Sequence, residues 1–387
     1  MITVGILSIT VTFILVNVLL GTSVGVLAFI SPTLPTQIIN FNYTIILIFT
    51  TAYTFFFQQF ILKMDWKNNL VTIALVSLWI LLLVFLSSIN FSNSYDSYGY
   101  HFDAIYCLRD WVHPNSPGCN GAIQAKHFPG LIFAINSFFV GTTGNIQSAN
   151  YFSLAAGSLL FLPVNNIARM KNINKWLRFT LIICILSNPI ILVQLWSTNN
   201  DGSSTCVFIL LSFALVNILK TENKNQILYI CIALICFMFL LGSKFSTGVI
   251  AVISIIILCC GHFLQSSTKT AKVKQLFNAV KIPALVLMPI FLWLIYFPYI
   301  TNVISGKHLF YPVFGSDVDW VSNINGQCFV DINRLARPFL AQFADFDTYG
   351  GSGCIELKFA SLLQPLYVYG LHFNRSGYIG GQAWLVA

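Results

Sequence analysis

Long apolar segments separated by short polar ones repeat along most of this 387-residue chain. Many of the apolar segments run to roughly 18 to 25 residues, the length that a helix needs to cross the hydrocarbon core of a bilayer. Because a backbone in lipid must satisfy its own hydrogen bonds, helices are the expected structure. The pattern predicts nine spans, at residues 4–29, 43–62, 69–88, 149–168, 177–196, 203–219, 226–242, 246–264 and 280–300.

A shorter apolar segment covers residues 128–142. At about 15 residues it is short for a span. A full crossing would also move the basic loop at 169–178 to the other side of the membrane. We therefore interpret this segment as a re-entrant or interface-lying helix.

The composition supports a membrane protein. The chain is 57% hydrophobic and only 8% charged, whereas soluble domains carry about 25% charged residues. The first apolar segment has no basic region before it and is too long for an ordinary signal peptide, so we interpret it as a retained helix. The sequence thus predicts an integral, multi-pass, all-α membrane protein surrounded by membrane lipids.

Lysines and arginines gather in particular loops, which predicts the orientation. The positive-inside rule places these loops in the cytoplasm. The N-terminus is then cytoplasmic, while residues 89–148, 197–202, 242–246 and those after 301 are extracytoplasmic. Since the basic residues follow topology, the net charge of +8 indicates no nucleic-acid partner. The basic residues of the cytoplasmic loops are Lys63, Lys67, Arg169, Lys171, Lys175, Arg178, Lys220, Lys224, Lys269, Lys272, Lys274 and Lys281.

Acidic residues show the opposite distribution. Of the twelve, only Asp65 and Glu222 fall on the predicted cytoplasmic side. Each of the others could simply solvate an outer loop, but together they indicate that any chemistry lies on the outer face. These outer acidic residues are Asp96, Asp103, Asp110, Asp201, Asp317, Asp319, Asp331, Asp345, Asp347 and Glu356.

Cysteine usage gives one structural hypothesis. Most of the ten cysteines lie in apolar segments, where cysteine packs as a small hydrophobe. Cys107 and Cys119 lie in the first outer loop, where a disulfide would close the loop if the compartment is oxidising. No cysteine or histidine spacing indicates a zinc site.

The first outer loop begins with SYDSYGYHFDAIY (94–106), directly after a span. Its first half predicts a short amphipathic helix with Tyr100, Ile105 and Leu108 near one face. The aromatic residues are typical of a membrane interface, but that does not explain Asp96 at the end of a span. A carboxylate beside apolar surface has a raised pKa and can act as a general base.

Several basic and acidic residues are candidates for the same site, each with a structural alternative. Lys126, His127 and Lys244 are predicted to lie on the outer side and could bind a phosphate, although Lys244 could instead snorkel to the interface. Asp201, in WSTNNDGS (196–203), could simply cap the helix that follows. The DxD triplet at 317–319 is too short to be specific.

The order of motifs from residue 90 onward resembles membrane glycosyltransferases of the GT-C class, especially the lipid-sugar-dependent aminoarabinose and protein O-mannosyl transferases. The first outer loop carries DSYGY (96–100), RDWVHP (109–114) and KHFPGL (126–131). GNIQSAN (144–150) and SNPIILVQ (187–194), which leads to NDG (200–202), follow. Related bacterial membrane proteins are similar at FPYITN (297–302), HLFYP (308–312) and YIGG (378–381).

The resemblance implies a GT-C-like bundle and a function. A polyprenyl-phosphate-linked sugar donor would react with an acceptor hydroxyl on a glycan, lipid or protein at the outer face of a bacterial inner membrane. Asp96 would be the general base, with Asp201 and Asp103 as further carboxylates. The resemblance also implies that Lys126 contacts the phosphate. Tyr100, His101, Arg109, His127 and Lys244 complete the predicted substrate-binding set.

The predicted organisation has four parts. Residues 1–88 form N-terminal transmembrane helices, 89–148 the outer loop with the site, 149–300 a transmembrane bundle and 301–387 an extracytoplasmic tail. Asp96 follows the third span rather than the first, and Gln124 stands where close relatives often have an acid. We expect a C-terminally truncated product, because the family has further helices beyond this point.

Other functions remain open from the sequence. A flippase, transporter or polymerase-like protein for lipid-linked glycans is one alternative, and an inactive relative is another. Ion-coupled transporters carry polar residues near the midplane, often in repeated halves, and the spans here are nearly free of charge. No cofactor is required by the pattern, although carboxylates near a phosphate could hold Mg²⁺ or Mn²⁺.

Overall fold

The structure is a computed structural model, and helices are its only regular elements within the residues it describes. The chain divides into two compact units, Met1–Leu309 and Phe310–Ala387, and the described helices all belong to the first. The described residues are 2–30, 42–89, 101–114, 126–127, 129–170, 200–220, 225–265 and 269–310, with residues 116, 118, 119, 174, 176, 177 and 180.

The first three helices follow the predicted apolar segments closely. They are α1 (Ile2–Ile30), α3 (Asn42–Phe60) and α4 (Trp66–Ser88). Helix α4 begins three residues before the apolar segment because Asp65 caps it: the Asp65 carboxylate accepts a hydrogen bond from the Asn68 backbone N–H at 2.8 Å. Asp65, one of the two acidic residues predicted on the cytoplasmic side, thus has a structural role.

The middle of the chain forms shorter elements. After α5 (Phe102–Arg109) come α7 (Leu131–Thr143), the 3₁₀ helix η3 (Ile146–Asn150), α8 (Tyr151–Ser158) and α9 (Phe161–Met170). The span predicted at 149–168 is therefore not one continuous helix, since a turn at residues 159–160 separates α8 from α9. Pro163 is tolerated in α9 because the backbone N–H groups of a first helical turn have no intrahelical acceptor.

Four long helices complete the bundle. Helices α12 (Asn200–Lys220), α13 (Asn225–Ser243) and α14 (Phe245–Gln265) follow one another, and α15 (Lys269–Ile295) continues through the π-type turn η4 (Tyr296–Ile300) into α16 (Thr301–Ile304). The chain kinks at Phe297, whose backbone leaves the helical region, with φ of −114° and ψ of 124°.

Five of the described helical segments are long and apolar enough to cross a membrane, which supports an all-α integral membrane protein. Nine spans remain a prediction, because the segment at 177–196 lies almost wholly outside the described residues, as do several side chains in the second half of α14 (Phe245–Gln265). The five segments are Gly5–Ile30, Trp66–Ser88, Gly202–Leu219, Gln226–Ser243 and Phe277–Ile304.

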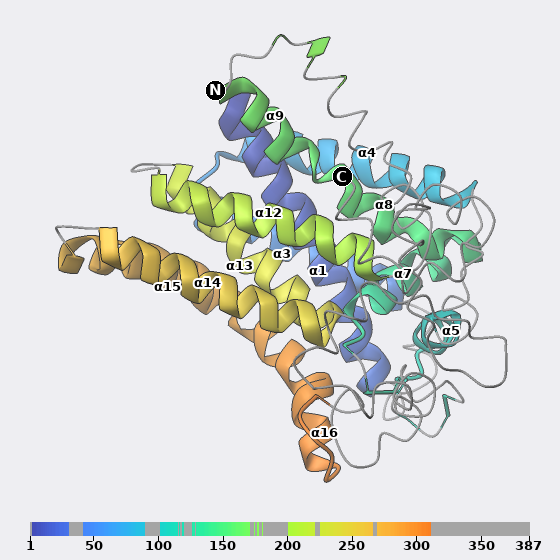
Figure 1. Ribbon diagram of the computed structural model, residues 1–387. Coiled ribbons are helices and arrows are strands. Elements are labelled where there is room, and N and C mark those ends of the chain that lie inside the picture. Colours follow the sequence, from blue (N-terminus) through green and yellow to red (C-terminus); the bar gives the residue numbers. More distant parts are fainter. Residues whose placement is uncertain are drawn as a thin grey trace, which may run out of the picture. The chain divides into compact units, whose positions relative to one another are not determined.

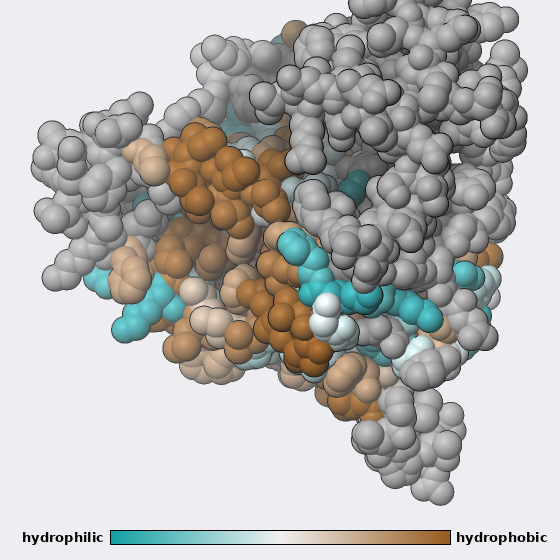
Figure 2. Space-filling view, turned by 60° about the horizontal axis from the view of Figure 1, so that its bottom comes forward, coloured by the Kyte–Doolittle hydropathy of each residue, from teal (hydrophilic) through white to brown (hydrophobic). Residues whose placement is uncertain are grey.

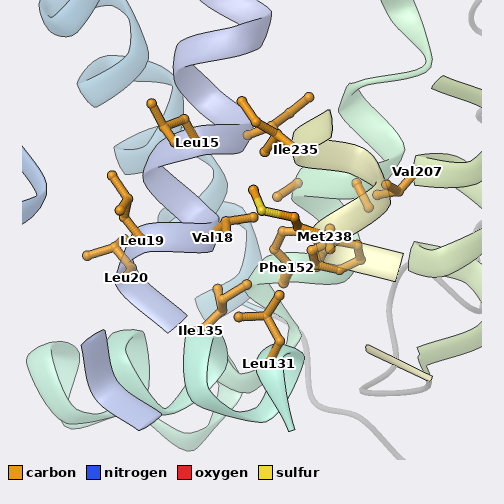
Figure 3. Close-up of a cluster of buried hydrophobic side chains, with 14 of the residues drawn as sticks. Leu15, Val18, Leu19, Leu20, Leu131, Ile135, Phe152, Val207, Ile235 and Met238 are labelled. Carbon is orange, nitrogen blue, oxygen red and sulfur yellow. The ribbon is translucent and has the colours of Figure 1, made fainter. Parts of the chain in front are cut away.

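The core lies where α1 meets α7, α8, α12 and α13 (Figure 3). Helix α1 runs through the middle of the described helices (Figure 1) and contacts α3, α4, α7, α13 and α15. Leucine and valine side chains of α1 point into this region, where Val18 lies near Met238 of α13 and Phe152 of α8. A helix that is apolar on all sides belongs inside a bundle, which explains the central place of α1.

The outer helices instead present apolar side chains to the surroundings. Only 22% of the apolar segment of α4 is buried, compared with 72% of that of α13. Figure 2 shows broad hydrophobic areas on one face of the molecule, with hydrophilic side chains beside them. Apolar surface of this extent is suited to lipid rather than water.

Polar contacts also join the helices. The Gln58 side chain of α3 donates to the Thr12 hydroxyl of α1 at 2.7 Å, and the Tyr53 hydroxyl of α3 donates to the Val286 carbonyl of α15 at 2.5 Å. Such hydrogen bonds stabilise helix pairs in a bilayer, where apolar contact alone gives little preference for protein over lipid.

Candidate functional site

The helix ends that the charge pattern assigns to the outer face meet at one end of the bundle. Gly242 at the end of α13 lies against Leu294 of α15 and Leu131 at the start of α7, while Gly21 of α1 lies against Leu131 and Ile135. We call this region, which also carries α5, the α5 end. The contacts of Gly242 and Gly21 bring these parts of α1, α7, α13 and α15 together; that this end faces away from the cytoplasm remains a prediction.

Helix α7 lies across the α5 end and does not extend through the bundle. Its first residue, Leu131, is beside Gly21 and Gly242, and near its other end Gly141 lies directly against the Tyr43 hydroxyl at the start of α3. Residues 131–140 are all buried. The segment predicted as re-entrant or interfacial is therefore a short helix enclosed by protein.

A disulfide closes the loop that follows α5. Cys107 and Cys119 are bonded, as the sequence analysis proposed. The short helix predicted in the first outer loop is also confirmed as α5, with Ile105 and Leu108 buried and Asp103 exposed. The disulfide and the buried face of α5 together fix this loop on the bundle.

Helix α5 ends in a turn that glycine usually makes. The Trp111 backbone has a φ of 59° and its N–H donates to the Leu108 carbonyl at 3.1 Å, while the Val112 N–H donates to the Cys107 carbonyl at 2.8 Å. This pair of bonds is a Schellman motif. A non-glycine residue in the left-handed region costs about 1 kcal/mol, and the contact between the rings of Trp111 and Tyr43, tilted by 51° with centroids 4.8 Å apart, offsets that cost.

A narrow pocket of about 30 Å³ opens at the α5 end. Three helices contribute glycine to its wall, through Gly21 and Gly25 of α1, Gly130 before α7 and Gly242 of α13. Trp293 of α15 forms an apolar side. The closely approaching glycine backbones leave a slot that is largely apolar and suited to a slender chain.

His113 adds a polar group to this pocket. Its side chain is 5% exposed and its ring meets Phe297 edge-on, with centroids 4.2 Å apart, and Phe29 at 5.6 Å. Burial lowers the pKa of His113 from 6.5 to about 4. The imidazole is therefore neutral at physiological pH and offers hydrogen bonding without charge.

His127 joins the outer loop to the end of α15. Its Nδ1 lies 2.9 Å from the side-chain oxygen of Asn302, and the Asn302 amide nitrogen lies 3.5 Å from the His127 carbonyl. Burial lowers the pKa of His127; the hydrogen bond to Asn302 opposes this, and the positive charges of Lys307 and Lys126 add to it. The charges of Lys126 and Lys307 thus both act on His127, and we call these three residues the cationic cluster.

Arg109 forms a salt bridge with its neighbour Asp110. Its guanidinium makes two hydrogen bonds with the Asp110 carboxylate, at 2.7 and 2.9 Å, and its carbonyl accepts from the Tyr43 hydroxyl at 3.1 Å. Much of the charge predicted to bind substrate is therefore offset by Asp110. His101 is also part of the packing, because it is buried with its ring 5.0 Å from that of Phe133 in α7.

Asp201 and Lys244 come from helix ends that are joined. The Ser204 hydroxyl of α12 lies 3.3 Å from the Ser243 hydroxyl of α13, one residue before Lys244. Asp201 belongs to the same first turn of α12, although its side chain lies outside the described residues. The backbone thus brings these two predicted positions to one place at the α5 end.

The predicted base cannot be placed. Asp96 and Tyr100 lie outside the described residues, so the structure leaves their roles as predictions. Sequence reasoning did not single out His113, Asn302 or Lys307. RDWVHP includes His113 and FPYITN ends at Asn302, so both lie in motifs that were noticed as whole segments.

The described residues contain no group of three or more histidine, cysteine or acidic side chains that could hold a metal ion. The DxD triplet at 317–319 and Asp96 are outside that part of the chain. No step of the chemistry below is assigned to a metal.

No protein-family model matches this sequence, and no curated protein or solved structure is significantly similar to it. The case for a function therefore rests on the chemistry of the α5 end.

Proposed function

We propose that the protein is an integral membrane glycosyltransferase that uses a polyprenyl-phosphate-linked sugar donor. The acceptor is a hydroxyl group of a glycan, lipid or protein, and the reaction takes place at the α5 end, on the outer face of a bacterial inner membrane. The supporting observation is that a glycine-walled apolar pocket and two lysines that flank His127 lie at the same end of the bundle. A lipid-linked sugar has the matching parts, an apolar chain and a phosphate.

The proposed reaction requires a general base and a cation that stabilises the leaving group. Asp96 accepts the proton of the acceptor hydroxyl as its oxygen attacks the anomeric carbon of the sugar. The bond between that carbon and the phosphate oxygen breaks, and its electron pair leaves with the polyprenyl phosphate. Lys126 stabilises the negative charge of the leaving group. After the transfer, the proton is bound to Asp96 and the additional negative charge is on the lipid phosphate.

The experiment compares the envelope glycans of deletion cells carrying wild type, Asp96→Asn or Asp65→Asn, by mass spectrometry. Asp65→Asn is a matched control, since it removes a carboxylate at the opposite end of α4 and asparagine is an equally good helix cap. We expect wild type and Asp65→Asn to restore a sugar modification that Asp96→Asn does not, at equal membrane levels. Restoration by Asp96→Asn would exclude it as the base.

A second measurement separates transfer from transport. Purified protein in liposomes is given a synthetic polyprenyl-phosphate sugar, and the lipid-linked sugar is followed by its cleavage and by its leaflet. Cleavage with release of polyprenyl phosphate supports the transferase. Movement between leaflets without cleavage would instead identify a flippase.

A further inference from the structure

Two lysines from distant parts of the sequence are brought together at the α5 end. Lys126 directly precedes His127 in the chain. Lys307 is fixed to Asn302, because its backbone N–H donates to the Asn302 carbonyl at 2.9 Å. Since the side chains of His127 and Asn302 are hydrogen-bonded to each other, both lysines flank the same contact.

A glycine makes this juxtaposition possible. Gly306 has a φ of 72°, and its N–H donates to the Val303 carbonyl at 3.0 Å. Together with the bond from Lys307 to Asn302 this forms a Schellman motif that ends α16. Glycine adopts the left-handed conformation without steric cost, so the chain reverses and Lys307 returns to the start of α16.

The positive charges around His127 favour the binding of an anion. Lys126, His127 and Lys307 are each half-buried, and both lysines lower the pKa of the histidine between them. Among the described acidic side chains of the α5 end, Asp103 is exposed and Asp110 pairs with Arg109. Partly desolvated cations gain more from an anion than fully hydrated ones do.

We propose that Lys126, His127 and Lys307 form a binding site for the phosphate group of a lipid phosphate. Gly130, three residues after His127, and Phe297, five residues before Asn302, both line the glycine-walled pocket. In this proposal the first carbons of the lipid chain enter that apolar pocket while the lysines hold the phosphate. This deepens the proposed function and rests on it for the ligand's role as sugar donor.

The test is direct binding to the purified full-length chain in detergent, by thermophoresis. Farnesyl phosphate is the main probe, farnesol reports on the apolar chain alone, and inorganic phosphate on the anion alone. The variants are Lys126→Ala and Lys307→Ala. Lys281→Ala is the matched control, because it removes an exposed lysine from the middle of α15, away from His127 and Asn302 in the sequence.

We expect each of Lys126→Ala and Lys307→Ala to weaken farnesyl phosphate binding by about tenfold, the usual scale for one charge-assisted hydrogen bond. Farnesol binding and the control should not change. Unchanged farnesyl phosphate affinity in Lys307→Ala would overturn the proposal. Inorganic phosphate that binds as tightly as farnesyl phosphate would overturn its lipid part and identify free phosphate as the ligand.

Two further observations keep the result interpretable. Lys307→Gln retains the length of the side chain and the backbone turn, so it replaces Lys307→Ala if that variant does not fold. Farnesyl phosphate binding through Lys307 without any sugar cleavage would preserve this site and refute the transferase. Wild-type transfer, with an unchanged KM for the lipid-linked sugar in Lys307→Ala, would refute the site alone.

Discussion

The imidazole Nδ1 of His127 lies 2.9 Å from the side-chain oxygen of Asn302, a residue 175 positions later in the chain. Because the Asn302 amide nitrogen faces the His127 carbonyl, its oxygen is the group that faces the ring. In this orientation of the amide, a neutral ring that carries its proton on Nδ1 donates to Asn302 and leaves Nε2 to take up a further proton. The contact therefore sets the protonation chemistry of the cationic cluster.

The first prediction concerns the pH dependence of anion binding. The pKa of His127 is below 6.5 in the free protein because of burial and of the charges on Lys307 and Lys126. A bound anion favours the imidazolium, so binding takes up a proton and affinity rises as pH falls. Each unit by which the anion raises this pKa corresponds to about a tenfold gain in affinity at the low-pH limit.

A phosphodiester probe suits this measurement, because it has no second ionisation near neutral pH. We expect wild-type affinity to increase between pH 7.5 and 5.5 and the affinity of His127→Gln to stay level. A His127→Gln profile that parallels wild type would show that another group takes up the proton.

The second prediction concerns His113 and stability. Its pKa is about 4 in the folded protein and about 6.5 in an unfolded chain. The unfolded chain thus binds the extra proton between these values, and stability falls as pH falls through that window. The difference corresponds to at most about 3 kcal/mol. Melting of the purified protein in detergent, followed from pH 7.5 to 4.5, measures it.

His113→Phe removes the titration and keeps an aromatic ring between Phe29 and Phe297. We expect its melting temperature to depend less on pH than that of wild type. His308→Gln is the control, because His308 is exposed. Equal pH dependence in wild type and His113→Phe would assign the acid sensitivity to other groups.

Much of the helical layout could be predicted, because apolar segments of sufficient length report directly on spanning helices. The structure differs from the prediction mainly where the hydrophobic pattern does not mark the beginning or the end of a helix. Helix α15 starts at Lys269 instead of residue 280, since lysine is a good helix former outside the membrane. The break between α8 and α9 is set by tertiary packing, which a continuous run of apolar residues does not record.

The site was predictable only in part. The bond between Cys107 and Cys119 was predicted from their position and is confirmed, whereas the roles of Lys126 and His127, proposed from their loop, remain predictions. The pairing of His127 with Asn302 depends on how α15 returns to the loop, and one amide in FPYITN gives no hint of it. Lys307 was missed for the same reason, although the glycine before it signals a reversal of the chain.

The third prediction compares two glycines of α1. A Cβ at Gly21 would lie 2.7 Å from both Ile135 and Leu131 side chains and 3.0 Å from the Leu131 carbonyl oxygen, whereas a Cβ at Gly5 meets nothing within 4 Å. We expect Gly21→Ala to destabilise the protein by about 1–3 kcal/mol through overpacking. Gly5→Ala should be neutral or stabilise by up to about 1 kcal/mol.

Unfolding of both variants in mixed detergent micelles gives the comparison. The two substitutions are chemically identical and lie in the same helix, so helix propensity acts on both alike. A Gly21→Ala protein as stable as Gly5→Ala would mean that α7 can move away from α1 at little cost.

The fourth prediction uses the disulfide to test the orientation. A stable disulfide between Cys107 and Cys119 requires an oxidising compartment, and the lysine and arginine distribution independently predicts that this loop lies outside the cytoplasm. In intact expressing cells, a membrane-impermeant reductant followed by an impermeant maleimide should therefore label these two cysteines.

Lys67→Cys tests the other side of the membrane. Lys67 is exposed near the start of α4 and belongs to a predicted cytoplasmic loop. Its thiol should react with the impermeant maleimide only after the cells are permeabilised. Labelling of Lys67→Cys in intact cells, with Cys107 and Cys119 protected, would invert the orientation. The α5 end would then face the cytoplasm, and the proposed transfer at the outer face would lose its premise.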